Sequence, residues 1–178
     1  VPLLLWNHRW DPDKDPGLFL RVVTELAAEG LEFTVALTGE RFARQHQEWD
    51  PVVAAVGDRV VASGHLEPDE YREVLRRSDI VVSTARQEFF GVSVVEAMYA
   101  GAFPLLPDRL VYPERVPGQL AEHSLYRGRR DLTERLRRAI NEVGETRRFG
   151  ERARVEASRY DWSMVAPKYD VWLESIVA

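Results

Sequence analysis

The chain has 178 residues, of which 45% are hydrophobic and 10% aromatic, enough to enclose one hydrophobic core and too few for two ordinary domains. The formal net charge of -5 argues against binding nucleic acid or an anionic membrane through bulk electrostatics. Cysteine is absent, which excludes disulfides and thiolate metal sites, and no apolar run approaches the roughly 20 residues that span a bilayer. We therefore expect a single cytoplasmic domain over residues 1–178.

Short apolar runs alternate along the chain with longer stretches of helical periodicity. The expected strands are Leu3–Trp6, Phe33–Leu37, Val60–Ala62, Ile80–Ser83, Phe103–Leu106 and Ser124–Tyr126. The expected helices are Pro16–Ala28, Phe42–Val56, Pro68–Arg76, Val92–Ala100 and Asp131–Val143. This alternation predicts an α/β domain with a doubly wound parallel sheet, Rossmann-like, covered by helices on both faces. Ligands of such folds bind at the carboxyl ends of the strands, so the segments that follow the strands are where chemistry is expected.

The clearest local signal is a pair of glutamates that brackets a glycine at a strand-to-helix junction. Glu88 is expected on the loop and Glu96 about one turn inside the helix, both on the cleft side. The free backbone N–H groups of Gly91, Val92 and Ser93, together with the helix dipole, form an anion site suited to a diphosphate. The two carboxylates can accept hydrogen bonds from sugar hydroxyls. The alternative is an ordinary helix with one acidic residue before it and one on its surface.

The loop after the first expected strand carries two cations, Arg9 and Lys14. A planar guanidinium and a point-charge ammonium suit the binding of a leaving diphosphate. The alternative is that both are solvated loop charges, paired with Asp11, Asp13 and Asp15.

Other familiar catalytic patterns are missing from the sequence. No Ser-His-Asp order is legible, and the four histidines have no metal-ligand spacing. The first strand is followed neither by a glycine-rich dinucleotide fingerprint nor by a Walker-type lysine loop, which argues against dehydrogenases and NTPases.

Several of these segments together resemble the C-terminal half of family-four retaining glycosyltransferases, which have the two-domain GT-B architecture. The Glu88 and Glu96 spacing matches the E-x7-E motif of that family. The resemblance runs from about Trp6 to Trp172, and its other motifs are Asn7-His8-Arg9 with Lys14, Thr38-Gly39-Glu40, Ser63 to Leu66, Ser83 to Glu88, and Ala100-Gly101. Trp6 to Trp10, Glu88 to Val92 and Leu110 to Glu114 resemble more narrowly the branch that contains tRNA-queuosine mannosyltransferase.

The resemblance implies a role for each matching residue. Arg9 and Lys14 would hold the donor diphosphate, Glu88 would contact the sugar hydroxyls, and Glu96 would bind the ribose. The segment around His65 and Leu66 would frame the base. The expected donor-binding residues are Arg9, Lys14, His65, Leu66, Glu88, Phe90, Gly91, Val92, Ser93 and Glu96, of which Glu88, Arg9 and Lys14 are also the expected catalytic residues.

The sequence departs from the wider family at two positions of these motifs. His8 stands where the family usually has glycine, so it can narrow the pocket or reach the transferred sugar. Phe89 stands where many relatives have glycine, although the narrower branch shares the phenylalanine.

Asp11-Pro12-Asp13 resembles the Asp-x-Asp metal clamp of a different glycosyltransferase architecture. Because the loop already supplies two cations, no metal is expected.

The implied reaction needs no cofactor, and its donor is a nucleoside-diphosphate sugar, GDP-mannose by the branch resemblance. The implied partners are the N-terminal acceptor domain, absent from this chain, and an acceptor, which the branch resemblance implies is queuosine in tRNA. The fragment alone is expected to be inactive. Two alternatives remain, a sugar-nucleotide epimerase of GT-B architecture and a non-catalytic nucleotide-sugar or RNA-binding module.

Two further regions, an apolar stripe near the C-terminus and a group of arginines, can each be interpreted in two ways. An apolar stripe at helical spacing near the C-terminus favours core packing, although the resemblance implies that this helix crosses toward the N-terminal half. Its members are Trp162, Val165, Tyr169, Trp172, Leu173 and Ile176. Arginines between Arg127 and Arg154 alternate with glutamates, which favours a solvated, self-paired surface over an RNA contact.

Overall fold

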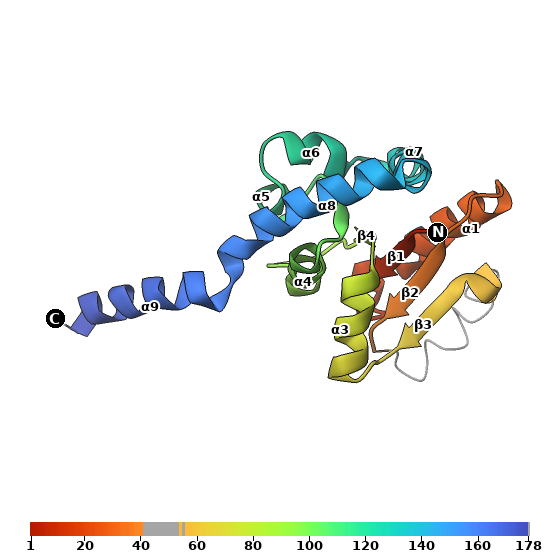
Figure 1. The fold of residues 1–178 in the computed structure, drawn as a ribbon. Helices are drawn as coiled ribbons and strands as arrows, with labels where there is room; N and C mark the ends of the chain where they lie inside the picture. The colour runs from red at the N-terminus through yellow and green to blue at the C-terminus, as the bar shows by residue number, and fades with distance from the viewer. Residues whose placement is uncertain (41–53, 55, 178) are drawn as a thin grey trace.

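A six-stranded parallel sheet forms the centre of the computed structural model, which describes residues 1–40, 54 and 56–177 (Figure 1). The strands are β1 (Leu3–Trp6), β2 (Thr34–Thr38), β3 (Val60–Gly64), β4 (Ile80–Val82), β5 (Phe103–Pro107) and β6 (Leu125–Tyr126). Their order in the sheet is β3-β2-β1-β4-β5-β6, and every neighbouring pair is parallel. The order reverses between β1 and β4, which places the topological switch point of the sheet there.

The helices that the structure describes connect these strands and extend the chain beyond them. They are α1 (Pro16–Ala28), α3 (Pro68–Arg77), α4 (Val92–Ala100), α5 (Tyr112–Arg115), α6 (Gln119–Ser124), α7 (Gly128–Asn141), α8 (Val143–Ala157) and α9 (Trp162–Val177). Single 3-10 turns cover Pro12–Lys14, Gly57–Arg59 and Ser158–Tyr160. The expected helix Phe42–Val56 lies almost wholly outside the described residues, and the labels accordingly pass from α1 to α3.

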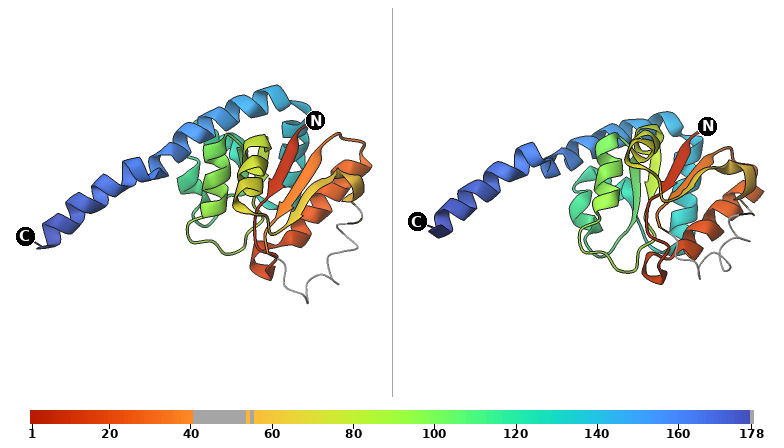
Figure 2. Two further views of the ribbon diagram at one scale, coloured as in Figure 1. Left: turned by 60° about the horizontal axis from the view of Figure 1, so that its bottom comes forward. Right: turned by 90° about the horizontal axis from the view of Figure 1, so that it is seen from below.

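The two faces of the sheet are covered by different helices, because successive side chains of a strand point in opposite directions. Leu4 and Trp6 of β1 belong to the larger apolar cluster, which includes residues of α1 and α7. Leu3 and Leu5 belong to a second cluster with Leu75 of α3 and Ala97 of α4. Both views in Figure 2 show helices on either side of the sheet. The predicted doubly wound α/β fold is therefore confirmed.

Most of the expected elements that fall on described residues are present with small shifts at their ends. The strand β1 and the helices α1 and α4 have the expected bounds, and β2 begins and ends one residue later than expected. The helix expected at Asp131–Val143 begins earlier, at Gly128, and ends at Asn141. Helices α5, α6 and α8 were not predicted. The sequence of α8 gives little signal because its buried residues are small or polar: Thr146, Gly150, Ala153 and Ala157.

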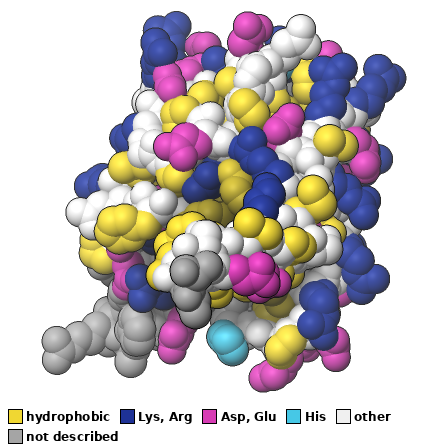
Figure 3. All heavy atoms as spheres, turned by 90° about the vertical axis from the view of Figure 1, so that its left-hand side faces the viewer, with side chains coloured by type: hydrophobic (Ala, Val, Ile, Leu, Met, Phe, Trp, Pro, Cys, Tyr) yellow, Lys and Arg dark blue, Asp and Glu magenta, His cyan; other side chains and the backbone are white. Residues whose placement is uncertain are grey.

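The expectation that the C-terminal stripe packs into the core of this chain is wrong. Helix α9 projects away from the sheet (Figures 1 and 2), and the side of the molecule from which it extends shows hydrophobic side chains among Lys and Arg side chains (Figure 3). Trp162 is 76% exposed, and Tyr169, Trp172, Leu173 and Ile176 are also exposed. The helical spacing was correctly recognised, but an apolar stripe does not say where its partner lies.

Helix α8 reaches the sheet through a glycine that has no room for a side chain. A Cβ atom on Gly150 would lie 2.1 Å from the carbonyl oxygen of Gly101, which follows α4. A Cβ atom on Gly144, in the same helix, would meet nothing within 4 Å. The contact of α8 with the end of α4 therefore requires glycine at position 150.

We predict that Gly150→Ala lowers the free energy of unfolding by about 1–3 kcal/mol, because backbone atoms must move apart to admit the methyl group. The matched variant Gly144→Ala should leave it unchanged or raise it by up to about 1 kcal/mol, as alanine favours helix. Urea unfolding of the two variants and the wild type gives both values. Equal stability of the two variants would contradict this packing.

Candidate functional site

The loops that follow β1 and β4 are tied together at the switch point of the sheet. The Thr84 hydroxyl accepts a hydrogen bond from the indole N–H of Trp6 (3.0 Å) and lies 2.7 Å from the carbonyl oxygen of Lys14. The backbone N–H of Arg86 donates to the carbonyl of Asp13 at 2.6 Å. Because β1 and β4 are neighbours, two loops about 70 residues apart in the sequence form one surface.

Lys14 and Glu88 form the central contact between these loops. The Lys14 ammonium lies 3.2 Å from Oε2 of Glu88, 2.7 Å from the carbonyl oxygen of Gln87 and 3.2 Å from Asp13 Oδ2. Only 12% of the Lys14 side chain is exposed, compared with 17% for Glu88. The structure thus brings together two of the three expected catalytic residues.

The carboxylate of Glu88 is held in its ionised form. Its other oxygen accepts the backbone N–H of Phe89 at 3.0 Å and lies 3.4 Å from that of Phe90. Burial acts to raise the pKa of Glu88, but the hydrogen bond and charge of Lys14, with backbone N–H groups, outweigh it, so the pKa lies below its usual value. A carboxylate that is ionised at physiological pH is a strong acceptor for hydroxyl groups.

Helix α4 begins directly beside Glu88. Gly91 precedes the helix in the left-handed conformation (φ 81°), and a Cβ atom there would approach the Tyr112 ring at 3.4 Å. The first amides of a helix have no acceptor within it, so those of Val92 and Ser93 are oriented toward the loop side. The N-terminal end of α4 therefore lies where the sequence predicted an anion site.

Arg9 does not share the partners of Lys14. Its side chain is 62% exposed and pairs with Asp11 at 3.2 Å. The alternative hypothesis, that the two cations pair with aspartates of their own loop, holds for Arg9 with Asp11 and for Lys14 with Asp13. Asp15 instead pairs with Arg86, at 2.7 Å. The exposed guanidinium of Arg9 is free to reorient at low cost, because surface ion pairs contribute about 0–1 kcal/mol.

Glu96 lies on α4 in contact with a residue that the sequence did not single out. The Tyr71 hydroxyl, from α3, donates to Glu96 Oε2 at 3.0 Å. The Asn7 side-chain amide donates to the Tyr71 oxygen at 3.1 Å and to the Ser93 carbonyl at 2.7 Å. A tyrosine within a helical segment carries no signal of this role, which depends on three elements meeting.

His8, in the loop after β1, has a buried side chain. It is 4% exposed, its ring packs edge-on against Trp6 with centroids 5.3 Å apart, and its Nε2 has no hydrogen-bond partner among the described residues. Burial, and next the charge of Lys14, lower the pKa of His8 to about 4 against the opposing effect of Glu88 and Asp13. The imidazole is therefore neutral at physiological pH.

A glycine lets the loop after β2 approach this histidine. A Cβ atom on Gly39 would lie 2.0 Å from the carbonyl oxygen of His8. The backbone N–H of Gly39 donates to the carbonyl of Gly64 at the end of β3, at 3.0 Å. The loops after β1, β2 and β3 are thereby held at the same edge of the sheet.

The remaining expected residues lie at the rim of this edge. His65 is exposed and Leu66 half-buried, directly after β3. Phe90 is 40% exposed, and its ring packs against the Arg115 guanidinium at 4.2 Å and edge-on to Tyr160 at 5.3 Å. Among the described residues, no hydrogen bond, ion pair or ring contact joins His65 or Leu66 to Lys14 or Glu88.

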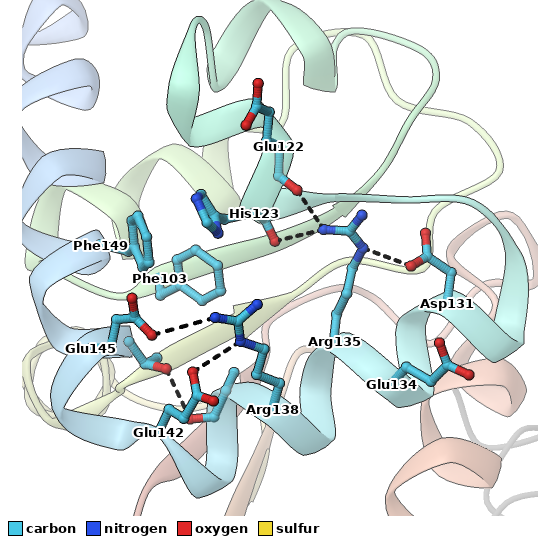
Figure 4. A pocket seen from close by; sticks show the side chains of 12 residues that line it. Phe103, Glu122, His123, Asp131, Glu134, Arg135, Arg138, Glu142, Glu145 and Phe149 are labelled. Carbon is cyan, nitrogen blue, oxygen red and sulfur yellow. Dashed lines mark hydrogen bonds and ion pairs between the residues drawn. The ribbon is translucent and has the colours of Figure 1, made fainter.

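Two hollows in the surface lie at different distances from this edge of the sheet. A cavity of about 400 Å³ lies between α6, α7 and α8, away from the loops described above. The two arginines that line this cavity already have partners in the protein (Figure 4). Arg135 binds Asp131 and the carbonyl oxygens of Glu122 and His123, and Arg138 binds Glu142 and Glu145. An open groove of about 850 Å³ runs between α3 and α4 and is lined by Tyr71 and Glu96.

Within residues 1–40, 54 and 56–177, no group of three or more His, Asp or Glu side chains is placed to hold a metal ion. In the same part of the chain no helix is long and apolar enough to cross a membrane. The arginines expected to pair with acidic residues of their own helical segment do so in part. Arg130, Arg135 and Arg138 pair with Glu134, Asp131 and Glu142 of that segment. Arg127, Arg129, Arg137 and Arg147 pair instead with acidic residues elsewhere in the chain, namely Asp108, Glu25, Glu29 and Asp79.

The sequence of residues 2–143 matches the family described as Glycosyl transferases group 1. The chain belongs to this family. It is 38% identical over 133 residues to the tRNA-queuosine alpha-mannosyltransferase of Drosophila melanogaster, covering 75% of the chain and 34% of that relative. It is 25% identical over 173 residues to the GDP-mannose:cellobiosyl-diphosphopolyprenol alpha-mannosyltransferase of Xanthomonas oryzae pv. oryzae, covering 93% of the chain and 45% of that relative.

Solved glycosyltransferase structures share the fold of this family member. Sucrose-phosphate synthase from Thermosynechococcus elongatus matches with a TM-score of 0.82 at 19% identity, over 99% of this chain and 45% of that one. The catalytic domain of cholesterol-alpha-glucosyltransferase from Helicobacter pylori matches with a TM-score of 0.73 at 17% identity, over 90% and 100% respectively. The glycosyltransferase family and fold inferred from the motifs are thus confirmed, and the chain spans less than half the length of the two curated relatives above.

The buried neutral His8 predicts a specific pH dependence of stability. An unfolded histidine protonates near pH 6.5, whereas native His8 stays neutral to about 4. Between these values the unfolded chain binds the extra proton, so the free energy of unfolding falls as pH decreases, by up to about 3 kcal/mol.

In His8→Gln the contribution of the histidine should disappear, so that over this range only the protonation of aspartate and glutamate side chains makes stability depend on pH. Urea unfolding between pH 7 and pH 4 compares the two slopes. Identical slopes, or a His8 pKa near 6.5 by NMR titration, would contradict the assignment.

Proposed function

We propose that this chain is the donor-binding half of a retaining glycosyltransferase that transfers mannose from GDP-mannose to queuosine in tRNA. The observation that carries the proposal is the Lys14 and Glu88 pair beside the first turn of α4, at the switch point of a sheet in this family. The choice of donor and acceptor rests on the names of the two mannosyltransferases to which the chain is similar.

The diphosphate of the donor would bind between Lys14 and the start of α4. The Lys14 ammonium donates to Gln87 and Glu88 and forms an ion pair with Asp13, and a phosphate oxygen would take the place of Asp13, whose side chain is 33% exposed. The amides of Val92 and Ser93 and the dipole of α4 add favourable interactions with the same charge. Arg9 is exposed on the same loop and turns from Asp11 toward the phosphates.

Glu88 and Glu96 would bind the two sugars of the donor. Glu88 is ionised and lies next to the cation that holds the diphosphate, so it accepts hydrogen bonds from hydroxyls of the transferred hexose. Glu96 lies further along α4, beside the groove between α3 and α4, and accepts those of the ribose. His65 and Leu66, at the end of β3, and Phe90 complete the nucleoside side of the site.

Transfer would depend on stabilising the departing diphosphate. As charge develops on the leaving phosphate, the cations and helix amides already in place interact with it more strongly than with the ground state. Neither a protein nucleophile nor a metal ion enters this account. Retention follows if the acceptor attacks from the face that the diphosphate leaves, and the acceptor would be held there by another domain.

An N-terminal acceptor domain, outside this chain, would supply that part of the site. The exposed apolar side chains of α9, such as Trp172 and Leu173, are suited to contact it. The ion-paired arginines of α7 favour tRNA binding by that domain rather than by this one. An epimerase or a non-catalytic module is less well supported, because the curated relatives named above are transferases.

We predict that Lys14→Ala weakens GDP binding by about 1–3 kcal/mol, the usual effect of losing a hydrogen bond to a charged group. Arg9→Ala should weaken it in the same direction. Isothermal titration calorimetry measures both. Lys168→Ala provides the matched control, because Lys168 is the other lysine of the chain and lies exposed on α9. Unchanged GDP affinity in both loop variants would exclude the diphosphate assignment.

A further inference from the structure

Tyr71 connects three separate elements through its hydroxyl group. It receives a hydrogen bond from Asn7, in the loop after β1, and gives one to Glu96 on α4. Asn7 is itself fixed to α4 by its second N–H, which donates to the Ser93 carbonyl. We propose that Tyr71 is a positioning residue that holds the Glu96 carboxylate in the orientation in which it binds the ribose hydroxyls of the donor.

The direction of each hydrogen bond in this chain of contacts is fixed by chemistry. The Ser93 carbonyl can only accept, so the Asn7 amide must present its NH₂ group there and to Tyr71. The Glu96 carboxylate can only accept, so the single phenol hydrogen of Tyr71 points to it. Burial, and next the charge of Glu96, raise the pKa of Tyr71, so the hydroxyl keeps the hydrogen that it donates.

Tyr71 restrains only one of the two oxygens of Glu96. It is the hydrogen-bond partner of Oε2, and the described part of the chain offers Oε1 no partner. The Glu96 side chain is exposed and lines the open groove between α3 and α4, so without Tyr71 it would sample several rotamers. Holding it in one rotamer removes part of the entropic cost of ligand binding.

This inference rests on the proposed function, in which Glu96 binds the ribose. The test therefore uses two probes, GDP and 2′,3′-dideoxy-GDP, which differ only in the ribose hydroxyls. We expect Tyr71→Phe, which keeps the partly buried ring, to bind GDP about 3- to 10-fold more weakly than the wild type. Its affinity for dideoxy-GDP should be unchanged, because that ligand makes no use of the oriented carboxylate.

The control is Tyr99→Phe, which removes another tyrosine-to-carboxylate hydrogen bond, from Tyr99 on α4 to Asp161 at 2.8 Å. It should bind both probes as the wild type does. Glu96→Gln serves as the reference for complete loss of the ribose interaction and should reduce the preference for GDP over dideoxy-GDP more than Tyr71→Phe does.

The possible outcomes separate the positioning role from the proposed function. If Glu96→Gln reduces the preference for GDP and Tyr71→Phe does not, the positioning role is wrong and the ribose assignment stands. An equal loss of both probes in Tyr71→Phe would show a merely structural role and also overturn the inference. If the wild type does not prefer GDP, or does not bind it, the ribose assignment itself fails, and the inference with it.

Discussion

The contact between the loops after β1 and β4 is the feature on which the rest of the site depends. Lys14 and Glu88 lie far apart in the sequence, and they meet because β1 and β4 are neighbours in the sheet at the point where its strand order reverses. Lys14 lowers the pKa of Glu88 through its hydrogen bond and charge, and it adds to burial, the larger cause, in lowering the pKa of His8, so one largely buried lysine influences the protonation of two neighbouring residues. A charged, water-poor pair beside a helix N-terminus is an arrangement suited to phosphate chemistry.

Much of the fold could be predicted because its signals are local. The strand β1 is an apolar run, and α4 lies between two glycines in the left-handed conformation, so both elements have the expected bounds. Helix α8 was missed because small residues such as Gly150 give no apolar period. The exposure of α9 was missed because an amphipathic stripe has the same sequence whether or not its partner is part of the chain.

The candidate site could be predicted in part for a related reason. The residues with charge in the strand-following loops, Lys14 and Glu88, were found, since side-chain chemistry and position are both visible in a sequence. Their direct pairing, and the place of Tyr71 between Asn7 and Glu96, depend on tertiary contacts between elements that no spacing rule connects. His8 was noticed only as a departure from the resembling family, and its burial gives that departure a physical meaning.

Amide NMR spectra of this chain during titration with GDP, and separately with guanosine, test the central claim that the diphosphate binds at the β1 and β4 loops. We expect GDP to shift the amide resonances of residues 9–15 and 86–93 in a saturable manner. Guanosine, which lacks the diphosphate, should leave those around Gly91 almost unchanged. Saturable shifts confined to the cavity between α6, α7 and α8 (Figure 4), or identical shifts with both ligands, would contradict the account.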